Sequence, residues 1–199
     1  MEKFQELLRR YEEADGEAAQ AAVEAELWRA FGIEGVVTVM DMAGFSLLTL
    51  RHGVVHYLAM VRRMQRIVRP VVKRHGGSVV KFEADNCFAR FPKVEPAIAA
   101  AVDVHRAFIH LNALLDDRSD ISVATGVDFG RFLLVDGGRD YFGSPVNLAS
   151  KLGEDLAQPG EILVSSEAMA RVSHLPDLGQ ETVRANVSGL DLVAVRILW

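Results

Sequence analysis

The sequence predicts an α+β domain in which helices cover an antiparallel sheet, with a helical segment before it. Short runs rich in β-branched residues, such as Val36–Met40, have the length and composition of buried strands. Two longer stretches, about 54–74 and 94–115, repeat apolar residues at the spacing of amphipathic helices. Half of the 199 residues are apolar and a quarter are charged, which supplies a core and excludes disorder as the main state.

The N-terminal part of the chain, residues 2–31, has a helical pattern. Its first apolar residues recur at helical spacing and would share one face: Phe4, Leu7, Leu8 and Tyr11. Gly16 interrupts this pattern, and Gly32 fits a helix stop. We predict that residues 1–32 form a helical segment that packs on the domain of residues 33–199 or on a second copy of itself.

The predicted elements of the domain begin in the order strand, helix, strand, strand, helix, strand. They are expected at residues 36–40, 54–74, 78–82, 87–91, 94–115 and 121–127, with another strand at 131–135. This β-α-β-β-α-β order predicts a ferredoxin-like core with an antiparallel sheet. Four more elements are expected after it: a helix at 146–155, a strand at 161–164, a short helix at 166–171 and a strand at 191–198.

The charge balance narrows the range of partners. The chain has 22 Lys and Arg against 27 Asp and Glu, for a formal charge of −5, which is the wrong sign for a general nucleic-acid binder. A single cysteine, Cys87, excludes a disulfide framework and a cysteine-based zinc site. No apolar run reaches the roughly 18–20 residues of a membrane span, and the acidic N-terminus does not resemble a signal peptide. We therefore expect a cytoplasmic protein that contacts neither nucleic acid nor membrane.

Two aspartates stand at the ends of predicted strands. Asp41 directly follows the apolar strand at 36–40, and Asp85 lies in the turn between the next two strands. In a ferredoxin-like sheet that turn lies beside the end of the first strand, so the two carboxylates can share Mg²⁺ or Mn²⁺. Taken singly, an aspartate in the position of Asp41 is more often a helix cap or turn residue than a metal ligand, and one in the position of Asp85 is more often a solvated turn residue.

A third candidate is the stretch 139–151. Asn147 and Lys151 are four residues apart, so they share one face of the helix predicted there. An amide and a cation on one face can position a sugar and a phosphate. The alternative is an exposed helix start without a ligand.

Three stretches together resemble the catalytic domain of the class III nucleotidyl cyclases, and bacterial adenylate cyclases in particular. The resemblance covers about residues 34–198. Its motifs are VVTVMDMAGFSLL at 36–48, HGGSVVKFEAD at 75–85 and DYFGSPVNLASK at 140–151. They occur in the family's order and at a similar spacing, and the predicted order of strands and helices agrees with the family's fold.

The resemblance implies a metal and phosphate site in the first half of the domain. Asp41 and Asp85 would bind two Mg²⁺ or Mn²⁺ ions per site, with the backbone of Met42 as a further ligand. The loop after the first strand would lie against the triphosphate through Gly44, Phe45 and Ser46.

The resemblance also implies a base-reading pair, Lys81 and Asp140, and a ribose-orienting residue, Asn147. Lysine can donate to adenine N1 and aspartate can accept from the 6-amino group, whereas guanine needs the reverse. Because a buried donor–acceptor mismatch is costly, this pair favours ATP over GTP. The implied reaction converts ATP to 3′,5′-cyclic AMP and pyrophosphate.

In the family the active site lies between two domains packed head to tail. This chain carries both sets of residues in one domain, so the resemblance implies a head-to-tail homodimer with two equivalent sites.

The chain departs from the family's pattern at three positions. Lys151 stands where a transition-state arginine is usual, Ala84 replaces a glycine, and Ser188 replaces a lysine. Lysine keeps the charge of arginine but not its planar fork, and alanine at 84 would be strained if that turn needs a positive φ. Two alternatives therefore stand beside an active adenylate cyclase: a weak or silent nucleotide-binding regulatory module, and a cyclase for another nucleoside triphosphate.

Overall fold

The computed structural model describes residues 1–112, 122–187 and 189–199, without the side chains of residues 45–48, 187 and 190. One mixed sheet has the strand order β2-β3-β1-β4-β6-β8-β7, and β5 pairs with the far end of β4. All pairs are antiparallel except β4 with β6. The strands are β1 (Gly32–Ala43), β2 (Ser78–Glu83), β3 (Asn86–Phe91), β4 (Ser122–Val135), β5 (Asp140–Phe142), β6 (Ile162–Ser165), β7 (Gly179–Val187) and β8 (Leu190–Leu198).

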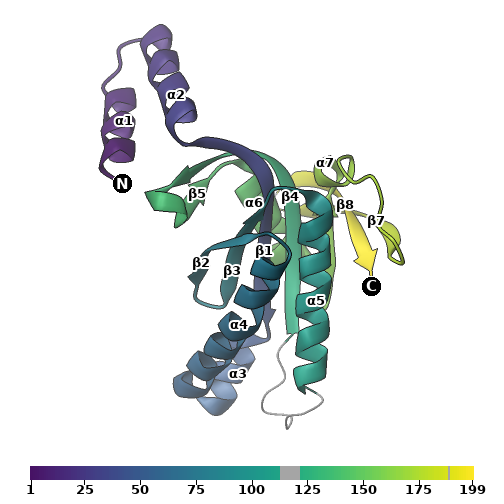
Figure 1. Ribbon diagram of the computed structural model, residues 1–199. Helices are drawn as coiled ribbons and strands as arrows, with labels where there is room; N and C mark the ends of the chain where they lie inside the picture. The colour runs from purple at the N-terminus through teal and green to yellow at the C-terminus, as the bar shows by residue number, and fades with distance from the viewer. Residues whose placement is uncertain (113–121, 188) are drawn as a thin grey trace.

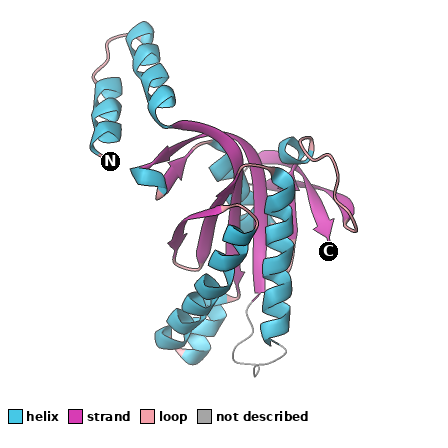
Figure 2. Cartoon of the chain, in the orientation of Figure 1, coloured by secondary structure: helices cyan, strands magenta, loops and turns pink. Residues whose placement is uncertain are grey.

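The helices lie on both faces of this sheet (Figure 1, Figure 2). They are α1 (Glu2–Glu12), α2 (Glu17–Phe31), α3 (Phe45–His52), α4 (Val54–Arg74), α5 (Val94–Asn112), α6 (Ser144–Ser150) and α7 (Ser166–Met169), with a 3₁₀ turn η1 (Asp136–Gly138) and a π-helical turn η2 (Lys151–Leu156). The order β2-β3-β1-β4, with α4 and α5 as the connecting helices, is that of a ferredoxin-like core. The predicted α+β class is therefore confirmed.

The central strand β1 is buried on both faces because its side chains alternate between two cores. Val36 and Met40 belong to the large core beneath α4 and α5, where Met64 and Ile98 are fully buried. The intervening residues, Val37 and Val39, belong to a second core that includes Phe132, Tyr141 and Ala149 of the opposite face. The continuous apolar run that predicted a strand at 36–40 reflects this double burial.

The predicted strands at 121–127 and 131–135 form one continuous strand, β4, from residue 122 onward, and the prediction of two was wrong. Gly130 is not a turn residue here. A Cβ on Gly130 would lie 2.7 Å from Cγ of Pro145, so glycine allows α6 to pack closely on β4.

Two further boundaries differ from the predictions, and one strand was missed. The helix predicted at 146–155 divides into α6 and the π-helical turn η2. The predicted helix at 94–115 is observed as α5 up to Asn112, and residues 113–115 and 121 lie outside the described residues. The edge strand β7 was not predicted, because its sequence GQETVRANV is largely polar and its residues are mostly exposed.

The N-terminal helices α1 and α2 lie side by side and project from the corner of the sheet where β1 begins (Figure 1). Phe4, Leu7 and Leu27 form a small cluster with Val135 of β4. The ring of Phe4 also stacks on Phe142 of β5, with ring centroids 5.8 Å apart. These contacts attach the helices to the sheet, and the division into residues 1–32 and 33–199 stays a prediction.

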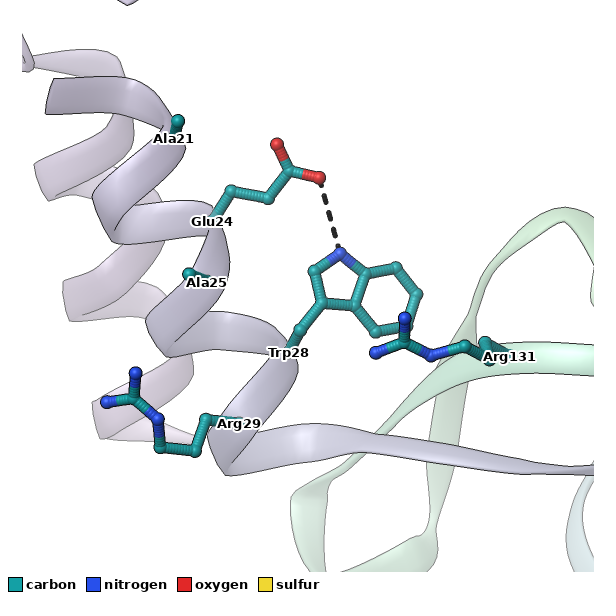
Figure 3. A pocket seen from close by; sticks show the side chains of 6 residues that line it. All are labelled: Ala21, Glu24, Ala25, Trp28, Arg29 and Arg131. Atoms are coloured by element: carbon teal, nitrogen blue, oxygen red, sulfur yellow. Dashed lines mark hydrogen bonds between the residues drawn. The ribbon is translucent and has the colours of Figure 1, made fainter. Parts of the chain in front are cut away.

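A second contact between α2 and the sheet involves Trp28 (Figure 3). Its indole N–H donates a hydrogen bond of 3.3 Å to Glu24, one turn earlier. The guanidinium of Arg131 on β4 lies 4.8 Å from the centroid of the Trp28 ring system, within the range of a cation–π interaction.

No helix in the described ranges is both long enough and apolar enough to cross a membrane.

A buried histidine joins α5 to β4. The side chain of His105 is 3% exposed, and its Nε2 lies 2.9 Å from the hydroxyl oxygen of Thr125. Burial lowers the pKa of His105 from 6.5 to about 4, although a backbone hydrogen bond at Gly160 acts in the opposite direction. The imidazole is therefore neutral in the folded protein at neutral pH.

We predict an acid-induced loss of stability from this histidine. The pKa of His105 in the folded protein lies below its value in the unfolded chain. As the pH falls from about 6.5 to about 4, the unfolded chain therefore binds a proton at this histidine that the folded protein does not. The free energy of unfolding should fall by up to about 3 kcal/mol as a result. Urea unfolding of the parent and of His105→Gln, near neutral pH and near the lower end of that window, measures it. The variant should lose less stability on acidification, and an equal loss in both proteins would contradict the prediction.

Candidate active site

The sheet brings Asp41 and Asp85 to one edge. Asp41 lies near the end of β1, opposite Asn86 of β3 and Ala124 of β4. The backbone N–H of Met42 donates a hydrogen bond of 3.2 Å to the carbonyl oxygen of Asp85. The ferredoxin-like strand order therefore juxtaposes two aspartates that are 44 positions apart in the sequence.

This edge concentrates negative charge. Burial, together with the nearby charges of Asp85 and Glu154, raises the pKa of Asp41 from 3.8 to about 7. Burial likewise raises the pKa of Glu154, with contributions from Asp155, Asp85 and Glu83. Among the described residues, neither Asp41 nor Asp85 forms an ion pair with Lys, Arg or His.

Glu154 was not predicted from the sequence, and its position depends on close packing. A Cβ on Gly126 would lie 2.5 Å from the backbone nitrogen of Gly153, and a Cβ on Gly153 would lie 3.0 Å from the carbonyl oxygen of Val39. The π-helical turn η2 therefore lies directly against β1 and β4, two residues along β1 from Asp41. This contact brings the Glu154 carboxylate into the field of the two aspartates. No local pattern in the sequence signals it.

The residues at this edge suit a divalent cation. Half-buried carboxylates that repel each other and lack a cationic side chain are stabilised by a bound positive charge, and Mg²⁺ and Mn²⁺ prefer oxygen ligands. Within the described part of the chain, no three His, Cys, Asp or Glu side chains are arranged to hold a metal ion by themselves. A cation here would thus take one or two carboxylates and complete its shell with other oxygens, as is usual for Mg²⁺.

The structure also brings Lys81 and Asp140 together, although they lie in different parts of the chain. The ammonium of Lys81 on β2 is 3.2 Å from a carboxylate oxygen of Asp140 on β5 and 2.8 Å from Glu83. Hydrogen bonding to Glu83, followed by that to Asp140, raises the pKa of Lys81. The backbone N–H of Tyr141 donates a 2.9 Å hydrogen bond to Asp140, which fixes its carboxylate. Glu83 is a partner of Lys81 that the sequence did not predict.

The loop after β1 turns at Gly44, whose φ of +80° is in the left-handed region, and α3 begins at Phe45. Met42 is buried. The side chains of Phe45 and Ser46 lie outside the described ones, so their contact with a triphosphate stays a prediction.

Asn147 and Lys151 lie at the start and end of one turn on the opposite face of the sheet from α4. The backbone N–H of Lys151 donates to the carbonyl oxygen of Asn147, so the i, i+4 relation predicted for them holds. Asn147 is exposed and Lys151 is half-buried. In the described residues Lys151 has no ion-pair partner, so its ammonium is available to an anion.

Ala84 has the strained conformation that the sequence suggested. Its φ is +51°, and Ala84 with Asp85 forms the two-residue connection between β2 and β3. Short hairpin turns use positive φ, for which glycine is the favoured residue. The chain thus keeps a strained residue next to the candidate metal ligand Asp85.

We predict that Ala84→Gly stabilises the protein by about 1 kcal/mol, because glycine adopts this φ without a Cβ clash. Ala22→Gly, at an exposed position of α2, is the matched control and should destabilise by about 1 kcal/mol. Thermal unfolding of both variants measures the difference. A lower melting temperature for Ala84→Gly would show that the turn is not strained.

Comparisons with known proteins agree with this fold. No protein-family model matches the chain. A putative adenylate cyclase from Rhizobium meliloti is 28% identical over 129 residues, which are 65% of this chain and 22% of that protein. An uncharacterized protein from Mycobacterium tuberculosis is 30% identical over 138 residues, 69% of this chain and 34% of that one. The chain therefore spans about a fifth to a third of the length of these curated relatives.

Among solved structures, the adenylate/guanylate cyclase/hydrolase from Silicibacter pomeroyi is 25% identical, with a TM-score of 0.66 over 84% of this chain and 98% of that one. The adenylyl cyclase CyaB from P. aeruginosa has a TM-score of 0.71 at 17% identity, over 84% and 96% of the two chains. Guanylyl cyclases are also similar, including Cya2 at a TM-score of 0.68 and 17% identity over 83% and 92%. The chain thus has the fold of the class III adenylate and guanylate cyclase catalytic domains, and the resemblance seen in its motifs is confirmed. This fold supports nucleotidyl cyclase activity.

Proposed function

We propose that the chain is an adenylate cyclase domain that converts ATP to 3′,5′-cyclic AMP and pyrophosphate. The observation that supports the proposal is that residues from distant parts of the sequence lie close together at two places. The backbone N–H of Met42, next to Asp41, donates a hydrogen bond to the carbonyl oxygen of Asp85, and Lys81 forms an ion pair with Asp140. In the reaction the ribose 3′-oxygen forms a bond to the α-phosphorus, and the bond from that phosphorus to pyrophosphate breaks.

The Lys81–Asp140 pair supports adenine as the base. The ammonium can donate to N1 of adenine, and the Asp140 carboxylate can accept from the 6-amino group. Guanine would present an N1–H donor to the lysine and an oxygen acceptor to the aspartate, so both contacts would be mismatched. Glu83 adds a second acceptor beside Lys81 and keeps the lysine in place.

Asp41, Asp85 and the backbone of Met42 would hold two divalent cations, Mg²⁺ or Mn²⁺. When bound, these ions lower the pKa of the ribose hydroxyl and neutralise the phosphates. The protein's own contribution would be to hold the two carboxylates near each other, Asp41 at the end of β1 and Asp85 in the adjoining turn, whose carbonyl oxygen accepts a hydrogen bond from the N–H of Met42. Gly44, Phe45 and Ser46 would border the triphosphate at the start of α3.

Asn147 would orient the ribose, and Lys151 would place its charge against the phosphate in the transition state. Loss of one preorganised donor can cost about 10²–10³ in rate, and lysine keeps the charge of the usual arginine while losing its fork. We infer an enzyme that is slower than its arginine-bearing relatives. A head-to-tail homodimer would combine the metal pair of one chain with the base-reading pair of the other.

The test is a product assay with MgATP and MnATP, read by mass-resolved chromatography. Cyclic AMP should form, and Asp41→Asn and Asp85→Asn should each reduce its rate at least about a hundredfold because they remove metal-binding charge. The matched control is Asp177→Asn, at an exposed position, which should retain the parent rate. Thermal stability should not fall in Asp41→Asn, because the substitution relieves repulsion from Asp85 and Glu154.

Metal-dependent ATP binding without any cyclic product would instead favour the silent regulatory module. In a competition among the four nucleoside triphosphates, a further outcome is that the enzyme converts another nucleotide faster than ATP. That result would assign the other nucleotide as the substrate. Full activity of the Asp41 or Asp85 variant would remove the metal assignment.

Subunit complementation tests the shared site. Asp41→Asn and Lys81→Ala should each be inactive or nearly so alone. In a head-to-tail dimer their mixture contains heterodimers with one intact site, so about a quarter of the parent activity should return. If no activity returns after mixing, under conditions where the subunits exchange, both pairs belong to the site of a single chain.

A further inference from the structure

Positive charge is concentrated in one segment of this acidic chain. Residues 42–82 contain eight Lys and Arg and no Asp or Glu, whereas the rest of the chain contains 14 Lys and Arg and all 27 Asp and Glu. Most of the segment is α3, α4 and β2. A local basic surface on a protein of net charge −5 is not explained by solubility, and it is not used by the proposed cyclase site except at Lys81.

The exposed face of α4 carries these cations in a line. Arg62, Arg66, Arg69 and Lys73 are exposed and follow one another at three- or four-residue spacing, so they form one stripe along the helix. Arg69 lies over the ring of Phe82, at 4.7 Å from its centroid. Arg62, Arg66 and Lys73 have no ion-pair partner within the described part of the chain.

The same stripe continues into an exposed apolar corner where α3 meets α4. Its aliphatic side chains are the most exposed group of large hydrophobic residues on the described surface: Leu50 is 84% exposed, Val54 59%, Val55 77% and Leu58 56%. The corner lies at the lower end of the molecule in Figure 1, beyond the end of β1 and away from the body of the sheet. Four such side chains grouped at a protruding corner are unusual on a free surface.

We propose that the α3–α4 face docks on an anionic phospholipid bilayer, with the aliphatic corner in the interface and the basic stripe along the headgroups. The contact is peripheral and involves no membrane span. It differs from the sequence-based expectation that the chain contacts no membrane. The proposal is independent of the cyclase activity.

A cleft beside the stripe suits a headgroup phosphate. It has a volume of about 510 Å³ and is lined by Arg69, Lys73, Gly77, Ser78 and Val79. Two cations and a hydroxyl group can therefore converge on one phosphate, while the neighbouring stripe meets others.

The combination of charges and aliphatic groups distinguishes a bilayer from other anionic partners. A nucleic acid offers phosphates but no apolar phase for Leu50 and Val55. A bilayer offers both: amphipathic helices rich in Lys and Arg bury their apolar face about 5–10 Å into the headgroup and acyl boundary while their cations meet anionic lipid. An acidic protein or a second copy of the chain would have to supply an apolar pocket that fits a convex corner.

The experiment is co-sedimentation of the full chain with vesicles of phosphatidylcholine alone or mixed with phosphatidylglycerol. The parent should bind only the mixed vesicles, and salt should weaken the binding. Arg62→Glu with Arg66→Glu should weaken it roughly tenfold or more. The matched control, Arg29→Glu with Arg184→Glu, makes the same change in net charge at two exposed positions outside this face and should bind as the parent does.

A third variant, Leu50→Ser with Val55→Ser, should also bind less while keeping the parent's oligomeric state by light scattering. No binding of the parent to mixed vesicles, equal loss in the control, or retained binding by Arg62→Glu with Arg66→Glu would each overturn the proposal. So would a change from dimer to monomer in Leu50→Ser with Val55→Ser, because a second copy would then cover the corner. Cyclase activity without vesicles should be unchanged in the Arg62 and Arg66 variant, so failure here leaves the proposed function standing.

Discussion

Hydrogen bonds along both edges of β1 hold it between β3 and β4, and the geometry of the candidate site depends on this pairing. Its two apolar faces are buried in separate cores, so the strand has no freedom to slip by one residue without exposing both sets of side chains. The register sets Asp41 opposite Asn86 and Ala124, and the next residue bonds to Asp85. The end of this strand therefore brings the Asp41 carboxylate within the electrostatic influence of Asp85 and Glu154.

Close approach of one helical element supplies the remaining groups. The segment that begins as α6 and continues as the π-helical turn carries Asn147, Lys151 and Glu154. Gly126 and Gly153 set its distance from the sheet, because a Cβ at either position would collide with backbone atoms. The same two glycines thus determine how near Glu154 comes to Asp41 and where the amide and cation stand relative to the sheet.

The separation of charges explains how a chain of net negative charge can still bind partners that carry phosphate. Carboxylates gather at the end of β1, where a divalent cation would neutralise both them and a polyphosphate, whereas most side-chain cations of residues 42–82 point outward from α4. The two regions lie near each other, since α3 and α4 follow directly from β1. Under the two proposals, one surface meets anionic lipid headgroups while the carboxylates at the end of β1 are left for metal-bound nucleotide.

Local patterns in the sequence determined the two long helices, the strands around them and the order that makes the core ferredoxin-like. They could do so because the spacing of apolar residues within a segment reflects that segment's own helix or strand geometry. The same order predicted that Asp41 and Asp85 would meet. Only the tertiary structure decided that β4 is continuous through Gly130, that Glu83 pairs with Lys81, and that Glu154 joins the aspartates. These features depend on contacts between segments that local periodicity does not describe, such as the fit of Pro145 against Gly130 and of Gly153 against Val39.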